Sequence, residues 1–300
     1  MLSTRFGVEI EFTGITRTAA ARIAEKYLHG TFLEGGTYYD AKLVTAPDGR
    51  TWKFMSDGSI RKQKKQDGNT KLVSNEAYSV ELVTPILTYR EDIETLQGLV
   101  RALRKAGGFP NSSCGIHIHL DGADHTVRSI RNFVNIIASK NDLFYKALAI
   151  EENRMRYCKK MDSALVEKIT ARRPKTLSDL EDIWYEGYGE NRHQHYHNSR
   201  YHFLNLHSFF NGHHTVELRG FNSTLHAGEI RSYIVLALAL NHQALTQTCA
   251  SNKKPQVENE KFAMRTYLCR LGLNGDEFAA CREHLTKNLD GNAAWRFRAA

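Results

Sequence analysis

Cysteine is sparse in this sequence and follows no recognisable motif. The 300 residues include five cysteines, and no two of them form a C-x-x-C pair. An odd number of widely spaced cysteines argues against a disulfide framework and against a zinc ribbon. We therefore expect a cytoplasmic protein, and Cys114, which precedes a glycine at a strand start, is expected to be a small buried side chain.

Long apolar runs are also missing. The best candidate, residues 233–240, continues into polar Asn241 and His242, and it is far shorter than the roughly 20 residues that cross a bilayer. The opening residues, MLSTRFGVEIEF, lack the charged and apolar regions of a signal peptide. We expect neither a membrane partner nor secretion.

Acidic residues are outnumbered, with 33 against 41 lysines and arginines and a net charge of +8. Such a balance favours anionic partners, among them nucleotides, nucleic acids and acidic peptides. The chain shows no helix-turn-helix, zinc finger or RNP-type motif, so nucleic-acid binding is an alternative that the sequence does not favour.

Alternating patterns carry most of the structural information. Strands are predicted where apolar and polar residues alternate with a period of two, at 6–12, 77–83, 114–121 and, as a hairpin, at 203–210 and 215–221. A second hairpin is predicted from 37–44 and 50–55, helices at 18–28, 91–105, 127–150 and 227–248, and a mobile basic loop at 61–69. A last pair of helices is expected at 259–271 and 276–289.

The polar faces of these strands hold potential metal ligands. One strand offers Glu9 with Glu11, another offers Glu81, and the others offer His117 with His119 and Glu217 with Arg219. Buried carboxylates are costly unless a cation compensates them. Ligands rich in oxygen suit Mg²⁺ or Mn²⁺ better than Zn²⁺, and such ions commonly accompany nucleotide phosphates. Arg219 could then stabilise a transferred phosphoryl group.

Simpler interpretations exist for each pattern alone. The Glu9 and Glu11 alternation is typical of a solvated edge strand, His117 with His119 could be a half-exposed strand or a zinc pair, and Glu217 with Arg219 could be a cross-strand ion pair. The histidine-rich stretch 193–202 is expected to be a surface loop more than a third metal cluster. The basic residues 61–65 could contact an acidic polypeptide or nucleic acid, or only solvent.

Taken in order, five motifs resemble those of the amidoligase family. They are G-x-E-I-E-F, V-E-L-V-T-P, C-G-I-H-I-H, L-N-L-H-S and T-V-E-L-R-G-F-N-S-T, between about residues 5 and 241. The family belongs to the carboxylate-amine ligase superfamily of glutamine synthetase and glutamate-cysteine ligase. The C-terminal helices lie outside the resemblance.

The resemblance implies a role for each matching residue. Glu9, Glu11, Glu81, His117 and Glu217 correspond to metal ligands, with Glu9 and Glu217 also placed in the catalytic centre. His119 is expected near the nucleotide phosphates, Arg219 on the transferring phosphoryl group, and Asn205 in a polar position of the nucleotide site.

The implied fold is α+β, a curved antiparallel sheet of the glutamine synthetase-like type with helices packed on one face. Residues 1–250 would form the catalytic domain and 251–300 a helical extension. The implied activity is ATP-dependent joining of a carboxylate to an amine through an acyl phosphate, with ATP and Mg²⁺ or Mn²⁺ as cofactors and a peptide or other macromolecule among the candidate substrates. A metal-dependent hydrolase with the same Glu and His residues is the alternative.

Overall fold

The computed structural model describes residues 1–36 and 38–295, and it divides into two compact units. The N-terminal unit consists of Leu2–Ile118 and Phe221–Arg231. The C-terminal unit consists of Met1, His119–Gly220 and the described part of Ser232–Ala300. We describe each unit by itself.

The sheet of the N-terminal unit has the strand order β2-β3-β4-β7-β1-β8. Neighbouring strands from β2 to β1 all pair antiparallel. The strands are β1 (Phe6–Phe12), β2 (Thr31–Glu34), β3 (Lys42–Thr45), β4 (Thr51–Met55), β7 (Val80–Val83) and β8 (Gly115–Asp121), the last of which continues into the C-terminal unit. The hairpin predicted from 37–44 and 50–55 is present as β3 and β4, but β3 begins only at Lys42, and residue 37 lies outside the described residues.

Strand β1 has the bounds that its alternation predicts. Phe6, Val8, Ile10 and Phe12 are at most 2% exposed, because the period of two places them together on the face that forms the core. The two glutamates therefore share the opposite face of the strand.

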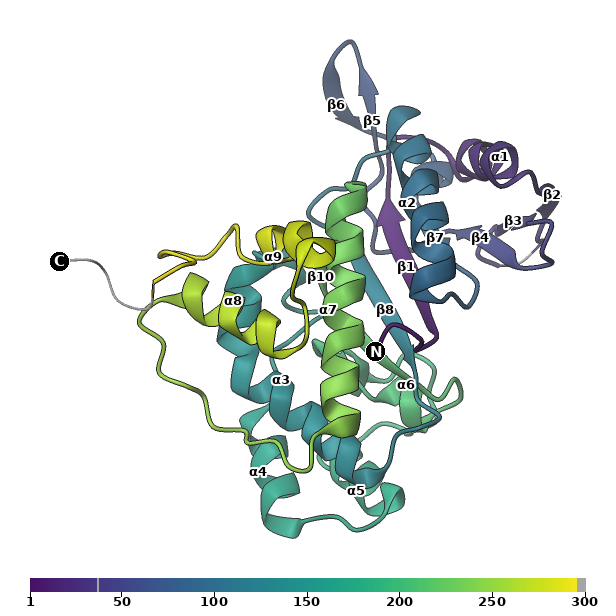
Figure 1. Cartoon of the computed structure of the whole chain (residues 1–300). Helices are drawn as coiled ribbons and strands as arrows, with labels where there is room; N and C mark the ends of the chain where they lie inside the picture. Colours follow the sequence, from purple (N-terminus) through teal and green to yellow (C-terminus); the bar gives the residue numbers. More distant parts are fainter. Residues whose placement is uncertain (37, 296–300) are drawn as a thin grey trace. The chain divides into compact units, whose positions relative to one another are not determined.

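Among the described residues, two α-helices lie wholly within the N-terminal unit. Helix α1 (Arg17–Leu28) begins where the Oγ1 of Thr16 accepts a hydrogen bond from the backbone N–H of Ala19, at 3.2 Å, which satisfies one of the donors that a helix start leaves open. It contacts strands β3 and β4 and helix α2 (Tyr89–Lys105) (Figure 1). A short 3₁₀ turn, Glu76–Tyr78, occupies the beginning of the strand predicted at 77–83.

The predicted loop at 61–69 is wrong. Strands β5 (Gln63–Gln66) and β6 (Asn69–Leu72) form a separate antiparallel ribbon instead (Figure 1). Asp67 and Gly68 connect them with φ values of 53° and 76°. Positive φ at both positions is the type I′ turn that joins two-residue hairpins, for which Asp-Gly is a preferred pair.

The C-terminal unit contains the remaining elements. Its sheet continues in the order β8-β10-β9, and β9 pairs antiparallel with β10. The elements are α3 (Val127–Ala147), α4 (Ser163–Arg172), α5 (Leu177–Tyr185), β9 (Leu204–Asn205), α6 (His207–Phe210), β10 (Thr215–Asn222), α7 (Ala227–Thr246), α8 (Glu260–Arg270) and α9 (Ala279–His284), of which β10 and α7 also extend into the N-terminal unit. The strand predicted at 203–210 is wrong after Asn205, because that side chain accepts a hydrogen bond from the N–H of His207, at 2.8 Å, and helix α6 begins there.

A mixed α/β architecture with a large antiparallel sheet is thus confirmed. The likeness to the glutamine synthetase sheet in particular stays a prediction, as does the division into a catalytic domain of residues 1–250 and an extension. In the part of the chain that the structure describes, none of the helices combines the length and the apolar character needed to cross a membrane.

Candidate active site

Strands β1, β7 and β8 bring Glu11, Glu81 and His117 together in the N-terminal unit. Glu11 and Glu81 are direct partners in the register of β1 and β7. One ligand atom from each of the three side chains lies within 4.8 Å of the others. Glu11 and His117 are buried, at 4% and 6% exposed. We call these residues, together with Glu9, the acidic cluster.

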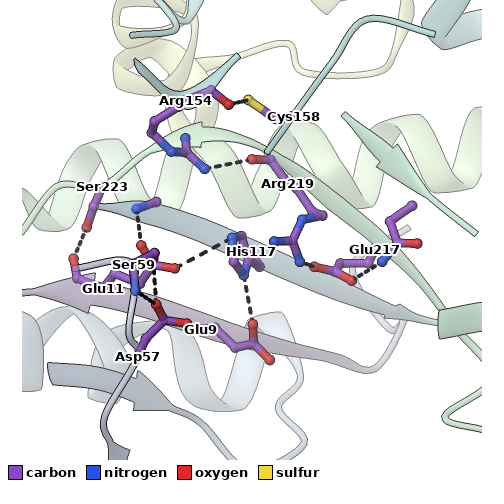
Figure 2. A network of polar contacts seen from close by, with 12 residues as sticks. Glu9, Glu11, Asp57, Ser59, His117, Arg154, Cys158, Glu217, Arg219 and Ser223 are labelled. Atoms are coloured by element: carbon purple, nitrogen blue, oxygen red, sulfur yellow. Dashed lines mark hydrogen bonds and ion pairs between the residues drawn. The ribbon is translucent and has the colours of Figure 1, made fainter. Parts of the chain in front are cut away.

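Three side chains of the acidic cluster, Glu9, Glu11 and His117, are linked by specific contacts (Figure 2). The Nδ1 of His117 lies 2.8 Å from Oε2 of Glu9, and its Nε2 lies 3.8 Å from Oε1 of Glu11. The backbone N–H of Gly115 donates to Oε2 of Glu11 at 2.6 Å. When Nδ1–H donates to Glu9, the lone pair of Nε2 is directed away from Glu9, as in metal-binding histidines that a carboxylate orients.

The donor set of the acidic cluster fits a hard divalent cation. Two carboxylates opposite each other in a sheet repel, and burial strengthens that repulsion because water screens it less. A cation bound by carboxylate oxygens and one imidazole would remove the repulsion, and Mg²⁺ and Mn²⁺ accept such ligands. Glu9 contacts His117 through a hydrogen bond, so it can orient that ligand as well as serve as one.

Asp57 and Ser59 hydrogen-bond to each other in the turn after strand β4 of the N-terminal unit (Figure 2). Both the N–H and the Oγ of Ser59 donate to Oδ1 of Asp57, at 2.6 and 2.5 Å. The Oγ of Ser79 in turn donates to the backbone oxygen of Asp57, at 2.6 Å. The D-G-S turn after strand β4 is the only sequence signal for this position, and a turn alone does not indicate a site.

A second cluster, in the C-terminal unit, is centred on Glu217. Oε1 of Glu217 accepts a hydrogen bond from Nη1 of Arg219 at 2.6 Å, and Oε2 accepts one from Nδ2 of Asn205 at 2.5 Å. Glu217, Arg219 and Asn205 are 2%, 5% and 2% exposed. We call this group the Glu217 cluster. Residues i and i+2 of a strand point to the same face, and Asn205 is the register partner of Glu217, so strands β9 and β10 together produce this geometry.

His119 lies at the margin of the Glu217 cluster. Its Nε2 is 3.9 Å from Oε1 of Glu217, and its Nδ1 is 3.3 Å from Oγ1 of Thr215. An imidazole here could donate to an anionic group near Glu217 when protonated, or accept from a hydroxyl when neutral.

Two residues beside Arg219 were not singled out in the sequence: Arg154, which binds its backbone, and Gly220, which follows it. Arg154, buried at 3% exposed, donates from Nη2 to the backbone oxygen of Arg219 at 3.0 Å (Figure 2). Only a glycine fits at position 220, because a Cβ there would lie 1.9 Å from Cδ2 of Phe203. Arg154 binds a backbone atom of a residue far from it in the sequence, so no motif indicates its role. Gly220, by contrast, stands within the L-R-G-F part of the fifth motif.

The structure therefore places the predicted residues in two groups. Glu11, Glu81 and His117 come together in the N-terminal unit, with Glu9 bonded to His117. Glu217, Arg219, Asn205 and His119 come together in the C-terminal unit. Their roles in binding metal and nucleotide stay predictions, and so does a shared action of the two groups on one substrate.

The histidine-rich stretch does not form a metal cluster in the described residues, because no group of candidate ligands there includes a histidine from 193–202. His197 and His202 are buried, against the expectation of a surface loop, while His193 and His195 are exposed. The ring of His197 stacks on that of His207 at 5.3 Å between centroids. This stretch is in part a packed histidine and tyrosine core.

Comparison with known proteins agrees with the five motifs. A family model described as "Putative amidoligase enzyme" matches residues 2–241. A search of curated proteins finds no match. The match covers most of the chain, and the chain belongs to this amidoligase family. Ligase activity is what the family suggests.

Proposed function

We propose that this protein is an ATP-dependent carboxylate-amine ligase that forms an amide or isopeptide bond through an acyl phosphate. An oxygen of the substrate carboxylate attacks the γ-phosphorus of ATP, and ADP leaves. The amine nitrogen then attacks the acyl carbon, phosphate leaves with the C–O electron pair, and the nitrogen loses a proton. The observation that supports this most is the register pair of buried Glu11 and half-buried Glu81 beside His117 in a chain of the amidoligase family.

The acidic cluster has the ligands for a divalent ion. Glu11, Glu81 and the Nε2 of His117 would hold it, while Glu9 orients the imidazole through Nδ1. The ion would supply charge neutralisation on the phosphate oxygens as the anionic carboxylate approaches them. The N–H of Gly115 limits the movement of Glu11 by binding one of its oxygens.

Arg219 is the residue we assign to the transferring phosphoryl group. A guanidinium on a rigid strand offers several N–H donors to phosphate oxygens. Glu217 and Asn205 orient it, and Arg154 holds its backbone. To contact phosphate, Arg219 can use the N–H groups that do not point at Glu217, because a guanidinium carries five.

The test is incubation of the protein with Mg-ATP and a panel of carboxylates and amines, with ADP release and product mass as readouts. ADP should form only when both substrates are present. For a productive pair, ¹⁸O placed in the carboxylate should appear in the released phosphate. Label that stays out of phosphate, or bond cleavage without ATP, would contradict the proposal, and the latter result would indicate a metal-dependent hydrolase.

Two variants separate the roles of the two clusters. E11Q should lose metal-dependent ATP binding, and R219K should bind ATP normally but turn over at least about tenfold more slowly, because lysine cannot reproduce the planar fork of arginine. E94Q, which changes an exposed glutamate of helix α2, is the matched control and should behave as wild type. Wild-type turnover of R219K would remove Arg219 from the proposal.

A further inference from the structure

The ribbon of β5 and β6, residues 63–72, is a fixed projection of the N-terminal unit. Among the described strands, β5 and β6 pair only with each other. An isolated two-stranded ribbon is marginal in water unless something holds it. Here the backbone oxygen of Gln63 accepts hydrogen bonds from Oγ1 of Thr13, at 2.8 Å, and from the N–H of Gly14, at 3.0 Å. The base of the ribbon is thus attached directly after strand β1.

Like charges lie opposite each other in the ribbon. Lys64 is the register partner of Lys71, an arrangement that lowers stability unless an anion lies nearby. The neighbouring Lys62 pairs with Glu76. By contrast, no ion pair within the described residues involves Lys64, Lys65 or Lys71. Lys65 instead lies over the ring of Phe109, 5.5 Å from its centroid, so the ribbon presents the charges of Lys64 and Lys71 together to whatever binds it.

The outer edge of β6 is open for pairing. The N–H of Val73 donates to the oxygen of Lys62 at 3.1 Å, so residues 62 and 73 are a hydrogen-bonded pair. Hydrogen-bonded and other pairs alternate along an antiparallel ladder. The backbone groups of Thr70 and Leu72 consequently point away from β5, toward an edge with which no described strand pairs. Such an edge can accept the main chain of another peptide.

We propose that the ribbon binds an extended acidic polypeptide by strand addition to β6. The main chain of the peptide would pair with the outward backbone groups of Thr70 and Leu72, and its carboxylates would lie against Lys71 and Lys64. The side chain of Leu72, 68% exposed, offers an apolar contact on the other face. This proposal does not depend on the ligase chemistry.

A polypeptide fits the ribbon better than a nucleic acid does. Binding of single strands relies on aromatic side chains that stack on bases, and residues 63–72, QKKQDGNTKL, include none. The open edge offers N–H and C=O groups in the spacing of a peptide main chain, which a phosphate backbone cannot match. Acidic residues on the added strand would also remove the repulsion between Lys64 and Lys71.

The first test measures binding of a fluorescent twelve-residue peptide of alternating Glu and Thr by anisotropy at low salt. The triple variant K64Q/K65Q/K71Q should bind at least about tenfold more weakly than wild type, because it removes the two lysines that face the peptide carboxylates, Lys64 and Lys71, and the neighbouring charge of Lys65. K26Q/K175Q/K253Q loses the same charge at exposed lysines elsewhere and should bind as wild type. Equal losses in both variants would show a response to net charge alone and overturn the proposal.

The second test addresses the backbone edge. T70P removes an outward N–H while leaving the ladder to β5 intact, as proline on an edge strand can, and should weaken the peptide about fivefold or more, whereas T70V should not. The same peptide with N-methylated amides should also bind more weakly, a readout that needs no variant. Unchanged binding of the methylated peptide would rule out strand addition. Tighter binding of a twelve-nucleotide polyuridine, lost in the lysine triple variant, would favour nucleic acid and overturn the proposal.

Discussion

Glu11 and Glu81 are register partners on neighbouring antiparallel strands, and both belong to one group of candidate ligands with His117. Adjacent carboxylates in a sheet lower stability, yet here they lie beside a buried histidine. A cation bound between the two carboxylates would offset this loss of stability.

Neutralising Glu81 should separate metal binding from folding. In the presence of a chelator, E81Q should unfold with the same free energy as wild type or with about 0.2–1 kcal/mol more, because one negative charge opposite Glu11 is gone. Wild type should gain about 2.7 kcal/mol from Mn²⁺ at a hundred times its Kd, and E81Q should gain almost none. Calorimetry with and without Mn²⁺ measures both effects. A normal Mn²⁺ response in E81Q would remove Glu81 from the metal site.

Arg219 should contribute to stability as well as to chemistry. Its Nη1 lies 2.6 Å from a carboxylate oxygen of Glu217, and both side chains are buried. R219A should lower the free energy of unfolding by about 3 kcal/mol, because Glu217 loses a charged partner away from water. The double variant R219A/E217Q should recover part of that loss in urea titrations. R192A, which breaks an exposed ion pair with Asp182, should cost less than about 1 kcal/mol. Equal losses in the two single variants would contradict the buried pair.

His207 should make the protein sensitive to mild acid. Burial, more than any neighbouring charge, lowers the pKa of His207 to about 4 from an ordinary value of 6.5. The unfolded chain therefore takes up a proton below pH 6.5 before the folded chain does, and stability is lost as the pH falls from 6.5 toward 4. At pH 5 this amounts to about 2 kcal/mol. H207Q should show a correspondingly smaller loss between pH 7 and pH 5 in urea titrations, and an unchanged loss would disprove the assignment.

Gly220 should not tolerate a side chain. G220A would force a Cβ to within 1.9 Å of the Phe203 ring, and overpacking of this kind costs about 1–3 kcal/mol. Because Gly220 follows Arg219, turnover should fall as well. G189A, where a Cβ would meet nothing within 4 Å, should leave both quantities unchanged. A stable, active G220A would mean that Phe203 moves freely, against its full burial.

Periodic segments were predictable and local interruptions were not. The bounds of β1 follow from alternation alone, and α1 ends at Leu28 as predicted and begins at Arg17, one residue before the predicted start. The strand predicted at 203–210 ends at Asn205 because a side chain that also binds Glu217 starts a helix there. The end of this strand therefore depends on the contact between Asn205 and Glu217, twelve positions away, which no local sequence pattern reveals.

The candidate site shows the same division. Individual strand faces could be predicted, since Glu9, Glu11, His117 and Glu217 all stand at alternating positions. The register of β1 against β7 could not, because it depends on how two strands pair across a long intervening stretch. The hairpin of β5 and β6 was also predictable, because Asp67-Gly68 is a strong hairpin signal. The prediction of a loop there relied on the basic composition of the segment instead.

Both units are assembled from segments far apart in the chain, and this constrains synthesis. The segment Phe221–Arg231 completes the N-terminal unit, where Ser223 binds backbone groups of Glu11 and Cys114 and Leu225 is buried. The unit that contains the strand with Glu9 and Glu11 therefore cannot be completed during synthesis until residue 231 has emerged from the ribosome. During that interval of some ten seconds or more, the apolar face of that strand has no finished core, and chaperones have their longest opportunity to bind the nascent chain.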